Sequence, residues 1–265
     1  MGVVNVTPDS FSDGGRFFDH ARALEHARKL RADGADILDI GGESTRPGAA
    51  PTTEAQELER VLPLIERLAA EGAIVSIDTM KPAVMRAAID AGASMVNDVR
   101  ALQEEGAMEA AGAHGVAVCL MHMQGAPRTM QHAPAYDDVV REVGDFLLAR
   151  AQACVDAGIE RERIAIDPGF GFGKTLQHNL DLLRGLPEIA AFGYPVVAGL
   201  SRKASIGRLT GRDVGERLAG SLAAALAALE RGASIVRVHD VRETADAIKV
   251  WRAICEEDRP DAPGA

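Results

Sequence analysis

The sequence has few aromatic residues and no excess of positive charge, and both scarcities narrow the choice of function. Aromatic side chains make up 4% of the 265 residues, and 29 lysines and arginines stand against 39 aspartates and glutamates, so the formal net charge is -10 at pH 7. Proteins that bind nucleic acids usually present a basic face. We therefore expect no nucleic-acid partner, and a phosphorylated small substrate would need a local pocket of positive charge.

The sequence also lacks disulfide, zinc and membrane signals. Its three cysteines, Cys119, Cys154 and Cys255, have no CxxC spacing and lie in apolar or helical stretches, so we expect buried free thiols in a reducing cytoplasm. No apolar run reaches the roughly 18 residues of a membrane span, and no cationic leader precedes an apolar core. These features predict a cytoplasmic protein that does not contact a membrane.

Eight short apolar runs end on side chains that form hydrogen bonds or ionise. Such runs are typical of parallel strands, whose two faces are both buried. The predicted strands cover residues 3–5, 37–40, 75–78, 95–98, 118–122, 164–167, 196–201 and 236–239. Because the ends of parallel strands meet at one edge of a sheet, these polar groups would surround a single mouth if the strands close into a barrel.

Between the strands, apolar residues recur at spacings of three and four, which predicts amphipathic helices. The helices are expected at residues 21–30, 58–68, 84–91, 108–113, 139–155, 180–190, 218–229 and 245–254. Several are followed by a glycine suited to a left-handed helix end: Gly34, Gly92, Gly158 and Gly232. The repeating unit is therefore a strand, a helix, a glycine and the next strand.

Eight such units form either a closed (β/α)8 barrel or an open doubly wound sheet. An open dinucleotide-binding sheet would show GxGxxG after its first strand, where this chain has NVTPD at residues 5–9. The prediction is a single-domain (β/α)8 TIM barrel over residues 1–255, with the active site at the C-terminal ends of the strands. Residues 256–265 are charged and contain proline, so a flexible tail is expected there.

Three predicted strands close on Asp78, Asn97 and Asp167. Two carboxylates and a carboxamide would form an acceptor-rich rim, which suits a flat heterocycle that carries an amino group and ring N–H groups. The simpler interpretation is that each residue caps the helix that follows its strand. That interpretation explains any one of the three more easily than all three together.

A second group of strand-end side chains favours anions. Lys203 follows the seventh strand, where barrels of this type often bind phosphate, and Arg237 and His239 point the same way from the eighth because they are two residues apart. An inward arginine in an apolar strand is costly unless it meets an anion. Arg46, in the loop after the second strand, would add a planar fork that matches two oxygens, although a lone loop arginine is usually just solvated.

The loops carry further signals. Residues 5–16 form either a surface loop with Asp-Gly turns or a lid over a bound substrate. At its start, the amide oxygen of Asn5 suits a hard cation such as Mg²⁺, which needs few protein ligands when phosphates supply the rest. The glycine-rich loop after the sixth strand is not a P-loop, because that motif requires glycine at Pro168. We expect Phe172 to form a wall of the pocket.

Seven stretches, in order, resemble the dihydropteroate synthase family of the folate pathway. They are NVTPDSFSDGG from residue 5, ESTRPG from 43, IDT from 77, VNDV from 96, DPGFGFGK from 167, SRK from 201 and RVHD from 237. The first stretch is highly specific, DPGFGFGK and ESTRPG are strong, and IDT or SRK alone would be weak. The resemblance extends from residue 3 to about residue 251.

The resemblance implies a transferase that joins para-aminobenzoate to (hydroxymethyl)dihydropterin pyrophosphate and releases dihydropteroate and pyrophosphate. It also implies a magnesium ion, a homodimer and a family targeted by sulfonamides. The residues expected to act in catalysis are Asp78, Asp167, Lys203, Arg237 and His239. The substrate-binding residues would be these five with Thr45, Arg46, Asn97, Met121, Phe172 and Ser201, and Asn5 would bind the metal.

Within that resemblance, each substrate has its own set of residues. The pterin would be held by Asp78, Asn97, Asp167 and Lys203. The pyrophosphate and its magnesium would be held by Asn5, Arg237 and His239. Thr45 and Arg46 would complete the aminobenzoate site.

Two alternatives stay open. A pterin-binding barrel that transfers methyl groups to a corrinoid would share the acidic residues, but it gives no reason for NVTPDSFSDGG, SRK and RVHD together. A catalytically silent pterin-binding module would keep Asp78, Asn97 and Asp167 and lose the anion-binding group, which this chain retains. Release of pyrophosphate that requires aminobenzoate would distinguish the three functions.

Overall fold

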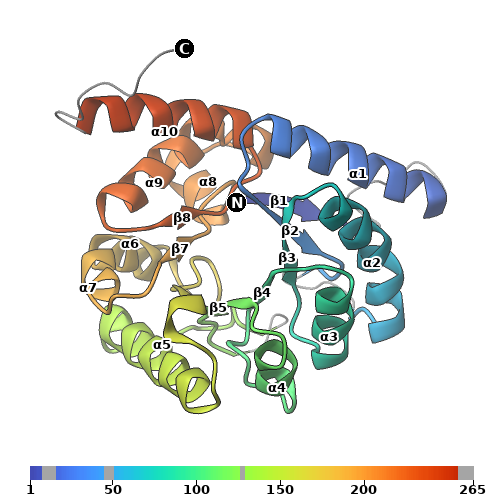
Figure 1. Ribbon diagram of the computed structural model, residues 1–265. Helices are drawn as coiled ribbons and strands as arrows, with labels where there is room; N and C mark the ends of the chain where they lie inside the picture. Colours follow the sequence, from blue (N-terminus) through green and yellow to red (C-terminus); the bar gives the residue numbers. More distant parts are fainter. Residues whose placement is uncertain (8–15, 45–50, 126–128, 256–265) are drawn as a thin grey trace.

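The computed structural model describes residues 1–7, 16–44, 51–125 and 129–255. Across these ranges, eight parallel strands surround a common centre and the helices lie outside them (Figure 1). The strands are Gly2–Asn5 (β1), Ile37–Gly41 (β2), Ile74–Asp78 (β3), Met95–Asp98 (β4), Ala117–Met121 (β5), Ile164–Asp167 (β6), Val197–Ala198 (β7) and Ile235–Val236 (β8). Each predicted strand is therefore present, and the last two are shorter than predicted.

The sheet closes on itself. Strands β1 to β6 pair in chain order and β7 pairs with β8, always in parallel. Single bridges complete the circle, from Ile166 to Val196 between β6 and β7 and from Gly2 to Val238 between β1 and β8. At the second bridge the Val3 amide donates to the Val238 carbonyl at 3.0 Å. The predicted (β/α)8 barrel is thus confirmed.

The helices cover the outside of the barrel. They are Arg16–Ala32 (α1), Glu54–Ala70 (α2), Pro82–Asp90 (α3), Ala107–Gly112 (α4), Val139–Asp156 (α5), Leu176–Arg184 (α6), Leu186–Ala190 (α7), Ala204–Thr210 (α8), Leu218–Glu230 (α9) and Val241–Cys255 (α10). The four glycines expected to end helices have φ between +93° and +106°. No helix in the described part of the chain is long and apolar enough to cross a bilayer.

One helix prediction was wrong, and one helix was missed. The segment at residues 180–190 is not one helix, because α6 ends at Arg184 and the separate helix α7 begins at Leu186, with Pro187 in its first turn. A Cβ atom at Gly185 would lie 2.7 Å from Val140 of α5, so the chain between α6 and α7 packs closely against α5 at this point. Helix α8 was not predicted, because its seven residues are too few to show a clear period.

The barrel wall divides the core into two parts. Alternate strand residues, such as Ile40, Ile77 and Ile166, face outward and pack against the helices in the main hydrophobic cluster. The other residues face inward. A smaller apolar cluster fills the interior away from the carboxyl ends of the strands. It contains Met1, Met95, Cys119, Ala165 and Val197. The inward positions nearer the carboxyl ends of the strands are polar, so the interior changes from apolar to charged along the barrel axis.

The thiols follow the prediction only in part. Cys119 and Cys154 are buried and free, as expected. Cys255 is also free but exposed, which corrects the expectation. It is the last residue of α10, whose final four residues are all exposed, so the helix end extends beyond the surface that it covers. The tail expected at residues 256–265 lies outside the described residues.

Two isoleucines of β3 test the contribution of the outer core. Ile77 is fully buried and Ile74 is 53% exposed. We expect Ile77→Ala to lower the free energy of unfolding by about 2–5 kcal/mol, because it leaves a cavity between the barrel and its helices. Ile74→Ala should cost less than about 1 kcal/mol. Urea unfolding measures both values, and equal losses in the two variants would contradict this packing.

Candidate active site

A buried charge network lies inside the barrel, and Arg237 is at its centre. Arg237 follows β8, and its Nε donates to Oδ2 of Asp39 on β2 at 2.6 Å. Its Nη2 donates to Oδ2 of Asp78 on β3 at 2.7 Å. Asn97 on β4 donates from Nδ2 to the same Asp39 oxygen at 3.1 Å. Strands β2, β3 and β4 and the residue that follows β8 therefore contribute side chains to one connected group.

Several acceptors in this group have no partner in the part of the chain that the structure describes. They are Asp39 Oδ1, Ser76 Oγ and Asn97 Oδ1. Asp39 and Ser76 are in register on β2 and β3, and Asn97 follows on β4, so the three atoms come from adjacent strands. Buried polar atoms normally find hydrogen-bond partners. This side of the interior therefore has unused capacity for hydrogen-bond donors.

Burial and neighbouring charges shift the pKa values of the acidic groups. Burial raises the pKa of Asp78 to about 7, while Arg237 acts in the opposite direction. Burial also raises the pKa of Asp167, and the Gly169 amide, which donates to Oδ1 at 2.7 Å, opposes that shift together with Lys203 and Arg237. Asp167 and Arg237 therefore interact electrostatically inside the barrel.

The cationic groups respond to the same environment. Burial lowers the pKa of Lys203 to about 8, and Asp167 partly restores it. Burial would also lower the pKa of Arg237, but Asp39 and Asp78 raise it above its ordinary value. Arg237 is therefore a permanent cation here, whereas the charge of Lys203 depends on the acidic group beside it.

Lys203 lies against the loop that follows β6. Its Nζ donates to the Phe170 carbonyl at 2.7 Å and lies 4.1 Å from the centre of the Phe172 ring. A Cβ atom at Gly171 would lie 3.1 Å from Lys203 Cδ, and Gly171 has a φ of +82°, so a side chain there would be strained and tight against the lysine stem. The half-buried Phe172 ring thus lies against the lysine.

Ser201 and His239 form a polar pair beside Arg237. The Ser201 hydroxyl accepts from the His239 amide at 3.2 Å and lies 3.2 Å from His239 Nδ1. Burial lowers the pKa of His239 to about 4, and Arg237 and Arg202 add to that shift. The imidazole is therefore neutral at pH 7. It can offer a hydrogen bond to an oxyanion but contributes no positive charge.

The remaining predicted residues have different positions. Asn5 ends β1, and a Cβ atom at Gly41 on β2 would lie 3.7 Å from Asn5 Oδ1 and 3.6 Å from Asp78 Oδ2. Met121 on β5 is buried and in register with Asp167. Thr45 and Arg46 lie outside the described residues. The described ranges contain no group of three or more His, Cys, Asp or Glu arranged to hold a metal.

Two parts of the site were missed by sequence reasoning. Asp39 is fully buried and binds both Arg237 and Asn97, yet it was not among the predicted residues. The sequence signal that could have found Asp39 is a carboxylate within an apolar strand. It lies two residues before the strand end, so it points inward with the residue at that end. Lys174 and His122, 2.9 Å apart, are also buried behind the β6 loop. Lys174 was visible only as the last residue of a motif.

A closed barrel that gathers carboxylates, cations and amides at the C-terminal ends of its strands is typical of a TIM-barrel enzyme acting on a charged small molecule. Comparison with known proteins gives the family. Residues 1–239 match the pterin binding enzyme family, and the chain belongs to it.

Relatives resemble the chain over almost its whole length. The dihydropteroate synthase of Escherichia coli K12 is 50% identical over 254 residues, which are 96% of this chain and 90% of the relative. That of Neisseria meningitidis serogroup C is 54% identical over 259 residues, covering 96% and 92%.

Solved structures agree with this family. Xanthomonas albilineans dihydropteroate synthase with 4-aminobenzoic acid is 55% identical, has a TM-score of 0.91, and is matched over 96% of this chain and 92% of its own. The same enzyme in complex with 7,8-dihydropteroate has a TM-score of 0.88 at 52% identity, with the same coverage of both chains. The Yersinia pestis enzyme in a sulfonamide complex has a TM-score of 0.91 at 49% identity, covering 96% and 93%.

Neighbouring polar residues test the charge network. We expect Asp39→Ala to lower the free energy of unfolding by about 3 kcal/mol, because it removes a buried partner of both Arg237 and Asn97. Ser76→Ala should be close to neutral, since the hydroxyl has no partner within the described ranges. Chemical denaturation of the two variants measures this difference. If Asp39→Ala proved as stable as Ser76→Ala, the network would not hold the interior together.

Proposed function

We infer that this chain condenses para-aminobenzoate with (hydroxymethyl)dihydropterin pyrophosphate to give dihydropteroate and pyrophosphate, in the synthesis of tetrahydrofolate. The activity is that of a dihydropteroate synthase, a transferase in which a new C–N bond replaces the C–O bond to pyrophosphate. One observation carries this proposal. The acceptor-rich group and the permanent cation meet in one mouth, with Arg237 2.7 Å from Asp78 and close enough to Asp167 to shift its pKa.

The acidic side of the mouth suits the pterin. Asp78, Asn97 and Asp167 offer acceptors to the amino group and ring N–H groups of that heterocycle. The unmatched oxygens of Asn97 and Asp39 leave further acceptors on this side for the N–H groups of a ligand, as far as the described residues show. Lys203, beside Asp167, adds a donor, and the Phe172 ring next to it can pack against the flat ring system. We place Met121 at the floor, next to Asp167 in the register of β5 and β6.

The cationic side suits the pyrophosphate. A guanidinium has five N–H donors, and Asp39 and Asp78 take one each, so up to three stay available for a diphosphate as far as the described residues show. The two carboxylates also fix the orientation of Arg237 before a ligand arrives. A preorganised donor of this kind stabilises a leaving group without reorganising during the reaction. Ser201 and neutral His239 can supply further hydrogen bonds to the phosphate oxygens.

A magnesium ion fits the same end of the site. Asn5 Oδ1 and Asp78 Oδ2 flank the position above Gly41 where another residue would place a side chain, so two hard oxygen donors face one small space. Asn5 would hold the ion and phosphate oxygens would complete its coordination. When bound, Mg²⁺ supplies charge neutralisation for the departing diphosphate.

The chain's own residues account for the remaining requirements of the reaction. The pterin is electron-rich, so loss of pyrophosphate can precede attack by the amine and leave a stabilised cation. The ionised form of Asp167 or Asp78 beside that cation stabilises it electrostatically. The weak aniline nucleophile must then be held near the carbon, which is a matter of positioning. We assign the aminobenzoate contact to Thr45 and Arg46, by the family resemblance.

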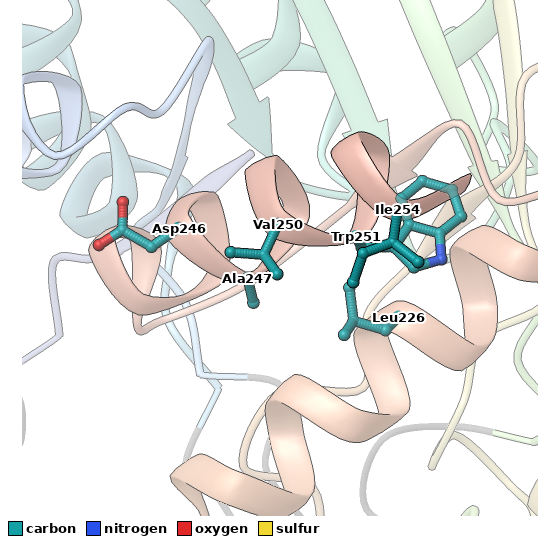
Figure 2. A pocket seen from close by; sticks show the side chains of 6 residues that line it. All are labelled: Leu226, Asp246, Ala247, Val250, Trp251 and Ile254. Carbon is teal, nitrogen blue, oxygen red and sulfur yellow. The ribbon is translucent and has the colours of Figure 1, made fainter. Parts of the chain in front are cut away.

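We also propose a cytoplasmic homodimer formed through α9 and α10. Helix α9 is apolar almost all round, with Glu230 as its one charged residue, and such a helix is normally covered. Val250 and Ile254 on α10 are 61% and 73% exposed. A hollow of about 430 Å³ lies between these helices, and Figure 2 shows the side chains that line it. It is lined by Leu226, Asp246, Ala247, Val250, Trp251 and Ile254.

Light scattering tests the dimer. We expect Val250→Asp to shift the protein from dimer to monomer, because it puts a charge into the apolar face that the second copy covers. Ile74→Asp is the matched control, since Ile74 is similarly exposed but lies at the start of β3, and it should remain dimeric. A wild-type protein that is monomeric at micromolar concentration would refute the proposal.

Measurement of pyrophosphate release tests the activity. Purified protein with (hydroxymethyl)dihydropterin pyrophosphate and Mg²⁺ should release pyrophosphate only when para-aminobenzoate is added, with dihydropteroate formed in equal amount. Removal of Mg²⁺ with EDTA should lower the rate by roughly 10² or more, since a preorganised charge at the leaving group is lost. Release that does not depend on the amine would show that the chain is not a synthase of this kind.

A further inference from the structure

The β6 loop, residues 168–175, is held by side chains to an unusual degree. Each main-chain carbonyl from Gly169 to Lys174 accepts a hydrogen bond from a side chain. The donors, in order along the loop, are Lys174, Lys203, Gln131, Lys174 again, Tyr136 and Asn179. Loops normally leave such groups to water. A loop with six consecutive carbonyls fixed in this way presents a well-defined conformation to the substrate.

Lys174 holds two of these carbonyls and is itself buried, with 3% of its surface exposed. Its Nζ lies 3.0 Å from the Gly169 carbonyl, 3.0 Å from the Phe172 carbonyl and 2.9 Å from His122 Nδ1. An ammonium has three N–H donors, so all of them are used. When Lys174 is charged it can only donate, so His122 then accepts through Nδ1 and carries its proton on Nε2.

Gly169 and Phe172, the two residues that Lys174 binds, also make contacts on the substrate side. The Gly169 amide donates to Asp167 Oδ1 at 2.7 Å, and the Phe172 ring lies 4.1 Å from Lys203 Nζ. Asp167 and Lys203 are the residues assigned to the pterin. Lys174 therefore binds Gly169 and Phe172 on the side of the loop away from the substrate. The same two residues contact Asp167 and Lys203 on the substrate side.

We propose that Lys174 is a positioning residue for the pterin subsite, which it keeps in shape through Gly169 and Phe172, with His122 as its third anchor. The inference rests on the proposed function, because it concerns how well the pterin is bound. Lys174 does not touch the substrate. Its effect passes through Asp167 and Lys203.

Close packing explains why this arrangement transmits small displacements. A Cβ atom at Gly169 would lie 1.9 Å from the His122 carbonyl, and one at Gly173 would lie 2.5 Å from the Gln124 carbonyl. The β6 loop thus lies directly on the chain that follows β5, with no space between the two backbones. Both glycines have positive φ, at +69° and +61°, so another residue would be strained as well as too large.

The charge of Lys174 adds to its role. Burial lowers its pKa to about 7, and Asp167 raises it while Lys203 lowers it further. His122 is neutral, since burial and Lys174 lower its pKa to about 3. The charged groups that act on Lys174 are therefore the two pterin residues, and the lysine in turn lowers the pKa of Asp167.

The substitution Lys174→Met tests the proposal, because it keeps the length of the side chain and removes all three donors. We expect the KM and the calorimetric Kd for (hydroxymethyl)dihydropterin pyrophosphate to rise roughly tenfold or more, since each lost charge-assisted hydrogen bond corresponds to about a tenfold change in an equilibrium constant. The KM for para-aminobenzoate should change less than threefold. Lys174→Arg should not restore pterin binding, because a planar fork cannot reach three acceptors arranged around one ammonium.

Tyr136→Phe is the matched control. It also removes one hydrogen bond from a loop carbonyl, that of Gly173, which has no recorded contact with Asp167 or Lys203 in the described structure. Its pterin KM should equal that of the wild type. A general loosening of the loop would raise the pterin KM in both variants, and that result would contradict a specific role for Lys174.

A folded Lys174→Met protein with unchanged pterin affinity would overturn the proposal. If Lys174→Met does not fold, pterin affinity is measured in His122→Leu instead. This variant removes one of the three hydrogen bonds of Lys174 and leaves the lysine in place. Weaker pterin binding would support the proposal and unchanged binding would refute it. Failure of the proposed function is distinguishable, because the wild type would then neither bind the pterin substrate nor form dihydropteroate.

Discussion

A guanidinium enclosed by two carboxylates is the interaction on which the rest of the site depends. A buried charge is strongly unfavourable unless it is paired, and pairing inside a barrel requires partners from different strands. Arg237, which follows β8, meets this requirement by donating hydrogen bonds to Asp39 on β2 and Asp78 on β3. These strands lie beyond the point where β8 meets β1. Closure of the sheet between β8 and β1 therefore also brings Arg237 to its two carboxylate partners. The closed barrel is needed to assemble the substrate site.

The balance of charges extends through the whole mouth. Asp39 and Asp78 flank Arg237, and Asp167 lies beside Lys203, while Lys174 is buried behind the β6 loop. Asp39 and Asn97 keep unmatched oxygens, and Arg237 keeps N–H groups that neither carboxylate takes within the described residues. A ligand with N–H groups at one end and phosphates at the other can use both sets, so one pocket can bind a flat base and a diphosphate.

Much of this arrangement could be predicted from the sequence, because strand ends are local signals. Apolar runs of four or five residues marked the strands, and the alternation of side chains placed Asp78, Asn97, Asp167 and Arg237 inside the barrel. Asp39 was missed because its role depends on Arg237, 198 residues away, and no local pattern shows which buried acid an arginine will meet. The roles of the individual site residues stay predictions.

Other features escaped prediction for related reasons. Lys174 ends a glycine-rich motif that is not a P-loop, and its partners on its own loop and at the end of β5 leave no local sequence signal. Helix α8 was too short to show a period, and the exposure of Cys255 depends on how far α10 extends beyond the barrel. Thr45 and Arg46 lie outside the described residues, so their assignment still rests on the family resemblance.

Calorimetric titration of pyrophosphate into wild-type protein and the Arg237→Ala variant tests the central claim most directly. A thermal melt of each protein establishes that it is folded, since Asp39 loses a partner in the variant. We predict that pyrophosphate affinity falls at least about tenfold, because a bidentate charged donor is removed. Equal affinity in a folded variant would show that Arg237 only neutralises Asp39 and Asp78, and would contradict its role in binding the diphosphate.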